Sequence, residues 1–159
     1  MKTYRLQTAL WLPQSRQRIF AFFSDPRNLE KITPPWLRFE ILSNELALDR
    51  GTRIDYRLRI RGLPIRWQSA ITAWEPPRRF IDRQTRGPYK TWVHEHTFDE
   101  HEGGTIAGDN VVYAVPGGKL VQKLLVEPDL ERIFQYRHEV LRSIFNPIRL
   151  QPSGMEKVN

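Results

Sequence analysis

The segment TWVHEHTF, residues 91–98, carries two of the four histidines in the chain. Because side chains alternate across a β-strand, His94 and His96 would share one face with Trp92 and Phe98. An imidazole can hydrogen-bond, transfer a proton near neutral pH or bind a metal ion. The spacing therefore predicts a chemically competent pair of side chains on an otherwise aromatic face.

Neighbouring segments supply partners for this pair. In RIDYRLRIRG, residues 53–62, every second side chain is apolar and the alternate ones are charged, so the apolar set must face inward. The same alternation applied to the other strands places aromatic and polar side chains around one concavity. The predicted ligand-binding residues are Tyr56, Trp67, Asp82, Gln84, Trp92, His94, His96, Asp109 and Tyr113.

Three kinds of site fit these residue types. Two histidines at i and i+2 with a nearby aspartate can bind zinc or iron. No third ligand lies close in sequence, so we expect a hydrogen-bonded His–Asp network, with no metal and no cofactor. His94 and His96 are also the candidate proton-transfer residues of an enzyme. The aromatic residues that could stack on a flat ligand, or fill the core instead, are Trp36, Tyr56, Trp67, Trp92 and Tyr113.

Other segments must position these residues. A strand is predicted over residues 4–12, followed by two short helices over 16–24 and 26–32, the first capped by Ser15. A period of two then predicts six more strands, at 38–44, 52–61, 65–75, 79–86, 91–99 and 105–115. Their short, Gly- and Pro-containing connections favour an antiparallel meander.

The C-terminal part is predicted to be helical. A short amphipathic piece covers residues 119–126, and the helix restarts near Pro128 and runs to 145. It carries Arg137, which could reach the concavity or extend to solvent. This is the only large amphipathic element that can cover the curved sheet, so the predicted class is α+β with a cavity between sheet and helix. We expect one domain over residues 1–147 and a flexible tail over 148–159.

The composition excludes some classes of protein. The chain has no cysteine and a net charge of +7, and its positive residues are spread along the sequence. We therefore expect no disulfide framework and no nucleic-acid partner. No apolar run is long enough for a membrane span, and the N-terminus reads as a strand, so we expect a cytoplasmic protein. The arginines on alternate positions, Arg57, Arg59 and Arg61, leave open a protein-docking role for the outer sheet face.

Four segments together resemble the START-like (SRPBCC, helix-grip) superfamily, in particular its bacterial ligand-binding, polyketide cyclase-like subgroup. They are FFSDPRNLEKITPPWLRFEI, GTRIDYRLRIRGLPIRWQSAI, PPRRFIDRQTRGPYKTWVHEHTF and GGTIAGDNVVYAVPGG. The resemblance spans residues 3–147. It implies a curved sheet of about seven strands around a long C-terminal helix. It also implies a lipid-like or polyketide-like ligand, bound reversibly or acted on by a cyclase or dehydratase using His94 or His96. The oligomeric state stays open.

Overall fold

The structure is a computed structural model that describes residues 1–44 and 47–145. The predicted tail over 148–159 lies outside the described residues. The strands are β1 (Tyr4–Leu12), β2 (Glu40–Ile41), β3 (Arg53–Ile60), β4 (Leu63–Glu75), β5 (Arg79–Arg86), β6 (Thr91–His101) and β7 (Gly104–Ala114). The helices are α1 (Arg16–Phe23), α2 (Arg27–Lys31), the 3₁₀ turn η1 (Pro35–Leu37), α3 (Gly118–Val121), the π-helical turn η2 (Gln122–Val126) and α4 (Glu127–Phe145).

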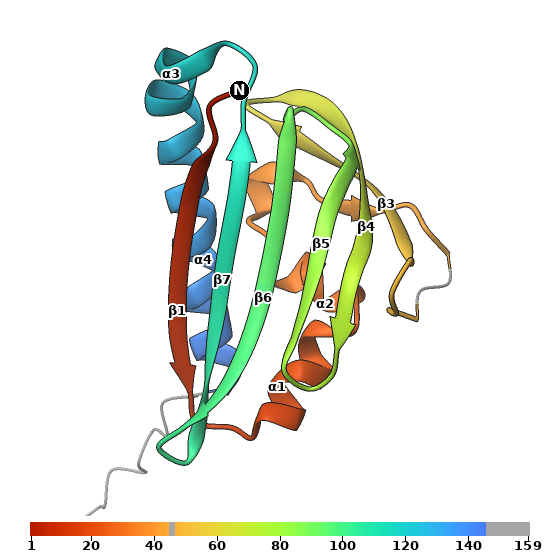
Figure 1. The fold of residues 1–159 in the computed structure, drawn as a ribbon, viewed down its shortest axis with the longest axis vertical. Coiled ribbons are helices and arrows are strands. Elements are labelled where there is room, and N and C mark those ends of the chain that lie inside the picture. The colour runs from red at the N-terminus through yellow and green to blue at the C-terminus, as the bar shows by residue number, and fades with distance from the viewer. Residues whose placement is uncertain (45–46, 146–159) are drawn as a thin grey trace, which may run out of the picture.

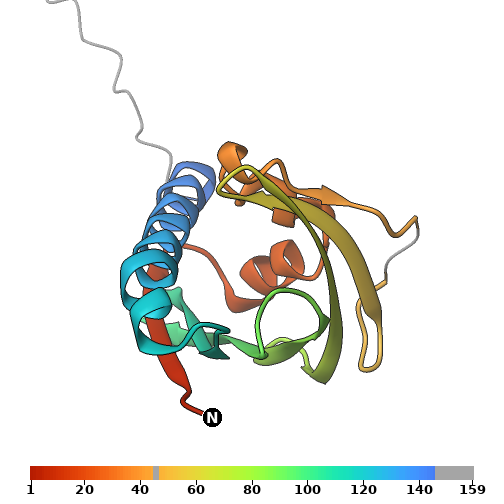
Figure 2. The ribbon, with the colours of Figure 1, turned by 90° about the horizontal axis from the view of Figure 1, so that it is seen from above.

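The seven strands form one antiparallel sheet in the order β1-β7-β6-β5-β4-β3-β2. All but one of these neighbours are consecutive in sequence, as short hairpin connections require. The sheet is strongly curved, and α4 runs alongside β1 and β7 (Figure 1). Seen from above, the strands curl around α1 and α2 while α4 borders the opposite side (Figure 2). This is the predicted helix-grip arrangement.

The alternation of side chains confirms the predicted inner faces. In β3 Ile54 and Leu58 are buried while the intervening charged residues are exposed, and in β6 Trp92, His94, His96 and Phe98 are all buried. Trp74 near the end of β4 does not share the alternation of Trp67, Ser69 and Ile71. The register with β5 shifts between Ile71 and Ala73, and this β-bulge returns Trp74 to the inner face, against Phe20 and Phe80.

Two predicted elements need correction. The strand expected over 38–44 is reduced to Glu40–Ile41, because Arg38 adopts the left-handed conformation that ends η1. The helix expected to restart near Pro128 follows η2 directly, so α3, η2 and α4 are consecutive from Gly118 to Phe145. Proline lacks the N–H that an α-helix needs, and the wider π-helical turn comes just before it.

The core has two clusters that meet at the histidines. One packs Phe20, Phe80 and Phe98 against Leu141 near the end of α4. The other includes Trp67, Trp92, Val111, Leu130 and Phe134. The His96 ring stacks on Phe80 of the first cluster, with centroids 4.1 Å apart, and His94 contacts Phe134 of the second, at 5.7 Å. The imidazoles therefore lie in the middle of the concave face.

Candidate ligand-binding site

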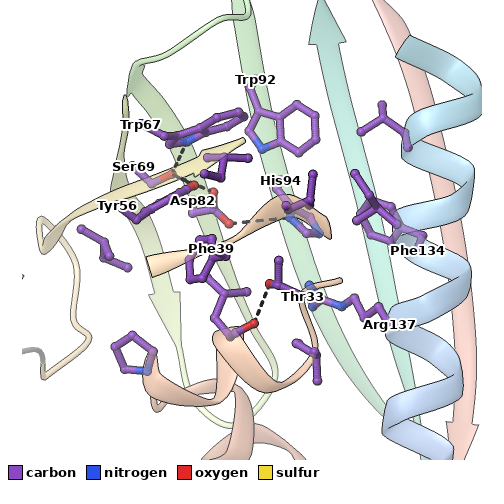
Figure 3. A pocket seen from close by; sticks show the side chains of 18 of the residues that line it. Thr33, Phe39, Tyr56, Trp67, Ser69, Asp82, Trp92, His94, Phe134 and Arg137 are labelled. Carbon is purple, nitrogen blue, oxygen red and sulfur yellow. Dashed lines mark hydrogen bonds and ion pairs between the residues drawn. The ribbon is translucent and has the colours of Figure 1, made fainter. Parts of the chain in front are cut away.

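A cavity of about 650 Å³ lies between the inner face of the sheet and α4. Its lining side chains come from α1, α2, η1, β3 to β6 and the consecutive helical segments α3, η2 and α4, and most of them are apolar. Figure 3 shows part of this wall. Six of the predicted ligand-binding residues lie on its wall. They are Tyr56, Trp67, Asp82, Trp92, His94 and His96. This is the size range of pockets that enclose a small organic molecule.

The polar part of this wall is built by strand register. Asp82 of β5 lies opposite His94 of β6, and His96 lies opposite Asp109 of β7. The carboxylate of Asp109 is 2.7 Å from His94 Nε2, and that of Asp82 is 2.9 Å from His96 Nε2. The two imidazole centroids are 3.8 Å apart. Two buried histidines thus share two carboxylates from the strands on either side, of which Asp109 is buried and Asp82 is half-buried.

Arg137 of α4 completes the group from the helix side. Its side chain is buried, and Nη2 lies 3.3 Å from Asp109 Oδ1 and 3.5 Å from His96 Nδ1. A buried charge needs such a partner, because an unpaired one would be costly in the interior. We call Asp82, His94, His96, Asp109 and Arg137 the histidine–aspartate cluster. The sequence left open whether the Arg137 side chain points to the concavity or to solvent, and in the structure it points inward.

A serine connects the cluster to the aromatic wall. Ser69 Oγ donates to Asp82 Oδ1 at 3.3 Å and accepts from Trp67 Nε1 at 3.1 Å, with Tyr56 Oη at 3.3 Å. These contacts hold the indole and phenol against the carboxylate (Figure 3). Ser69 is not among the predicted site residues, because a lone serine in a strand carries no distinctive signal.

The environment sets the charges of the cluster. Burial, followed by repulsion from His94, lowers the pKa of His96 to about 4, so this ring is neutral at neutral pH. Burial favours the protonated form of Asp82, but its hydrogen bond with His96 and the neighbouring imidazoles outweigh burial and lower the pKa. For Asp109 burial is likewise outweighed, mainly by Arg137, and the pKa lies well below its usual value. Both carboxylates are therefore ionised.

Three predicted site residues do not line the cavity. Asp109 lies behind the histidines, where it also accepts from Thr8 Oγ1 at 3.4 Å. The paired region of β5 and β6 ends at Arg83, and the amide of Gln84 instead bonds the backbone N–H and carbonyl of Tyr89. Tyr113 accepts from Gln122 of η2 at 3.2 Å. All three side chains lie on the predicted face of their strands, but each contacts another part of the chain and not the cavity.

The cluster also contains a set of metal-type donors. One atom each from Asp82, His94 and His96 lies within 4.8 Å of the others. Tertiary structure thus supplies the third ligand that the sequence lacked nearby. Two features disfavour the binding of a metal cation here. Each imidazole already has a nitrogen at hydrogen-bond distance from a carboxylate, and the guanidinium of Arg137 adds positive charge at the site.

The remaining aromatic candidates lie at different depths. Trp67 and Trp92 are buried and meet edge to face, with centroids 5.4 Å apart. Tyr89 is half-buried and lines the cavity beside both of them. Trp36 is exposed, contacts Tyr136 of α4, and also borders the cavity. The deep pair is available for apolar contact with a ligand, whereas Trp36 sits at the edge.

These features define a helix-grip protein with an internal cavity, and known structures share the fold. Protein Ms6760 from Mycobacterium smegmatis is 22% identical, with a TM-score of 0.65 over 88% of this chain and 89% of its own. CV1439 from Chromobacterium violaceum is 14% identical, with a TM-score of 0.70 over 90% and 98%. The ginseng major latex-like protein 151 from Panax ginseng is 12% identical, with a TM-score of 0.69 over 91% and 99%.

The family is shown by sequence as well. Residues 12–139 match the model of the family described as polyketide cyclase / dehydrase and lipid transport, and the chain belongs to that family. No curated protein matches the chain. The predicted START-like membership is therefore confirmed. No helix within residues 1–44 and 47–145 has the length and apolarity needed to cross a membrane.

Proposed function

We propose that the protein reversibly binds a small, largely apolar molecule that carries a polar group. The observation behind this proposal is a mainly apolar cavity with one buried polar cluster on its wall. Trp67, Trp92 and Tyr56 would contact the apolar body of the ligand. Asp82 and the two histidines would orient its polar group, since burying such a group without partners is costly.

The atoms that remain free suggest which polar groups would fit. His94 Nδ1 lies 3.8 Å from Asp82 Oδ2, too far for a hydrogen bond, while its Nε2 is engaged by Asp109. If Nε2 carries the proton, Nδ1 of this cavity-lining residue is left as a hydrogen-bond acceptor. Together with the ionised Asp82, it favours a ligand that donates a hydrogen bond, such as an alcohol, a phenol or an amine.

Native mass spectrometry of freshly purified protein should reveal a small molecule that co-purifies with it.

Naphthol serves as a defined probe and should raise the melting temperature of the protein. A ligand that binds only the folded state stabilises it by about 2.7 kcal/mol at a hundred times its Kd. Naphthoic acid, its carboxylate counterpart, should bind more weakly. Absence of any co-purifying molecule together with no stabilisation by either compound would contradict the proposal.

A cavity-filling variant makes the location of binding testable. Val126 lines the cavity, whereas Lys123 on the same π-helical turn is exposed. Val126→Trp should lower the affinity for naphthol by about tenfold or more, since the larger side chain occupies ligand space. Lys123→Trp should leave it unchanged. Equal affinities for the two variants would place naphthol outside the cavity.

A second candidate function is proton transfer in a cyclase or dehydratase reaction. The short contact between His94 and Asp109 favours it, because a carboxylate on one ring nitrogen orients the other for use as a base. In that case His94→Gln should slow cyclisation of a linear poly-ketone by about 10²–10⁴-fold. Its affinity for the substrate should change little. Loss of affinity without loss of turnover per bound substrate would favour the binding role.

Docking through the arginine-bearing sheet face has less support. Arg57 pairs with Glu40 of β2 and Arg61 pairs with Asp129 of α4, so two of the three arginines already have acidic partners in this chain. Arg59 remains without an ion pair among the described residues. Replacement of all three arginines should therefore change stability before it changes any association.

A further inference from the structure

Four large apolar side chains are exposed near one border of the cavity. Leu120 of α3 is 71% exposed, Leu124 and Leu125 of η2 are 60% and 41% exposed, and Leu63 at the start of β4 is 67% exposed. We call these four residues the leucine patch. Scattered exposed leucines are ordinary, but several on adjoining elements commonly mark an interaction site.

The helical part of the patch has its polarity reversed relative to a normal surface helix. Leu120 and Leu124 are four residues apart and point to solvent, as do Lys119 and Lys123. The polar Gln122 is buried instead and donates to Tyr113. A helix that presents leucines and lysines together on its outer face is typical of segments that lie in a membrane interface.

The fourth leucine comes from the β3–β4 turn, which lies against this helix. Arg61 Nη2 donates to the Leu125 carbonyl at 3.4 Å and the guanidinium pairs with Asp129. Arg61 and Gly62 both have positive φ, which gives a tight two-residue hairpin with Leu63 directly after it. The hairpin and α3 both lie at the upper end of the molecule in Figure 1.

Positive side chains lie on the same elements as the leucines. Lys119 and Lys123 flank the helical leucines, and Arg59 and Arg66 lie on the outer face of the hairpin strands that carry Leu63. All four are exposed, and none forms an ion pair within the described residues. Of the nearby acidic groups, Asp129 is paired with Arg61 and Glu127 accepts from the amide of Gln122 at 3.4 Å, while Glu131 lines a surface hollow together with both lysines. Exposed leucines with exposed cations on the same elements are complementary to an anionic lipid surface.

We propose that the leucine patch and these four cations dock the protein on the surface of an anionic lipid bilayer. The leucines enter the interface between headgroups and acyl chains, and the cations contact the headgroups. Leu125 belongs to the patch and also lines the cavity. Docking therefore brings the border of the cavity to the lipid surface, where an apolar ligand can enter without crossing water.

Vesicle co-sedimentation of the full chain tests this inference. The protein should sediment with vesicles of equal parts phosphatidylcholine and phosphatidylglycerol, and much less with pure phosphatidylcholine. Leu120→Ser combined with Leu124→Ser should weaken binding about tenfold or more, since two buried leucine side chains are lost. The matched control, Leu42→Ser with Ile144→Ser, removes two exposed apolar residues outside the patch and should bind like the wild type.

Charge and self-association provide the remaining arms of the test. Lys119→Glu with Lys123→Glu should abolish the preference for phosphatidylglycerol, and added salt should weaken binding. Circular dichroism would verify that every variant is folded. The proposal is overturned if the wild type sediments with neither vesicle, or if the leucine variant binds as well as the control. It is also overturned if the leucines mediate a dimer without lipid, because the patch would then belong to a second copy.

Discussion

The histidine–aspartate cluster and the leucine patch depart from the usual distribution of residues in opposite directions. The cluster buries four ionisable side chains, those of His94, His96, Asp109 and Arg137, beside the half-buried Asp82, whereas the patch leaves four leucines in solvent. Their partners also differ. Each buried charge has a counterpart within hydrogen-bond distance, while the exposed leucines have no cover from the described part of the chain.

The difference shows that buried charges and exposed leucines make different demands on the fold. A buried charge would destabilise the fold by itself, so its partners must come from the same chain. An exposed leucine costs little folding free energy, so its partner can be another molecule. Both regions border one cavity, through Asp82 and the histidines on one side and Leu125 on the other. Such local exceptions are where function is expected.

The largest expected effect comes from breaking the ion pair in the cluster. Arg137→Ala leaves the buried Asp109 carboxylate without its guanidinium and should lower the free energy of unfolding by about 3–5 kcal/mol. Urea denaturation would measure it. Arg142→Ala, which removes an exposed arginine from the last turn of the same helix, should cost less than about 1 kcal/mol. A cost below about 1 kcal/mol for Arg137→Ala would mean that the pair contributes little.

The pH dependence of stability should be the next largest effect. The pKa of His96 is about 4 in the folded protein and near its usual 6.5 when unfolded, so only the unfolded chain binds this proton between those values. Stability should be constant with respect to this group above pH 6.5 and fall by about 2 kcal/mol between pH 7 and 5. Equilibrium unfolding at a series of pH values measures the slope.

Two histidine variants isolate that effect. His96→Gln removes the titrating ring, so its stability should vary less between pH 7 and 5 than that of the wild type. His101→Gln changes an exposed residue at the end of β6 and should keep the wild-type slope. Burial also lowers the pKa of His138. This residue therefore adds a loss of stability toward low pH in all three proteins. Identical slopes for His96→Gln and wild type would contradict a neutral, buried His96.

Substitutions in the leucine patch should affect stability much less than substitutions in the histidine–aspartate cluster. Leu120→Ser with Leu124→Ser should change the free energy of unfolding by less than about 1 kcal/mol, which reflects helix propensity and not lost packing. The same double variant is the one expected to lose vesicle binding. Thermal and urea unfolding would compare it with wild type. A loss above about 2 kcal/mol would show that these leucines pack within the fold.

The smallest expected effect concerns metal. If the cluster is a hydrogen-bond network, an excess of Zn²⁺ should shift the melting temperature by less than about 2 °C, because no binding energy is linked to folding. Differential scanning calorimetry with and without a chelator measures this. A larger rise that disappears in Asp82→Asn would instead identify Asp82, His94 and His96 as ligands.

Much of the concave face could be predicted because each strand carries its own pattern. The alternation around Ile54 and Leu58, and that around His94 and His96, predicted burial that the structure confirms. These patterns are local, since a strand sends successive side chains to opposite faces whatever its neighbours are. The same reasoning identified the histidines as facing the cavity, together with Trp67 and the other aromatic residues of its wall.

The partners within the face could not be predicted in the same way. Asp109, Gln84 and Tyr113 have the parity of cavity residues, yet each is engaged elsewhere. Whether an inward side chain meets the cavity depends on where strand pairing stops and which part of the sheet a helix covers. The role of Ser69 has the same origin, since only packing brings it between Trp67 and Asp82.

By itself, the sequence determined the succession of strands and helices, the class of fold, and the face of β6 that holds the paired histidines. Only the tertiary structure decided that Asp82 and Asp109 reach those histidines, that Arg137 turns inward, and that four leucines of β4, α3 and η2 stay exposed. Periodicity acts within one segment. The contacts of the cluster join residues that are 14 to 41 positions apart in the sequence, so they depend on strand register and helix placement.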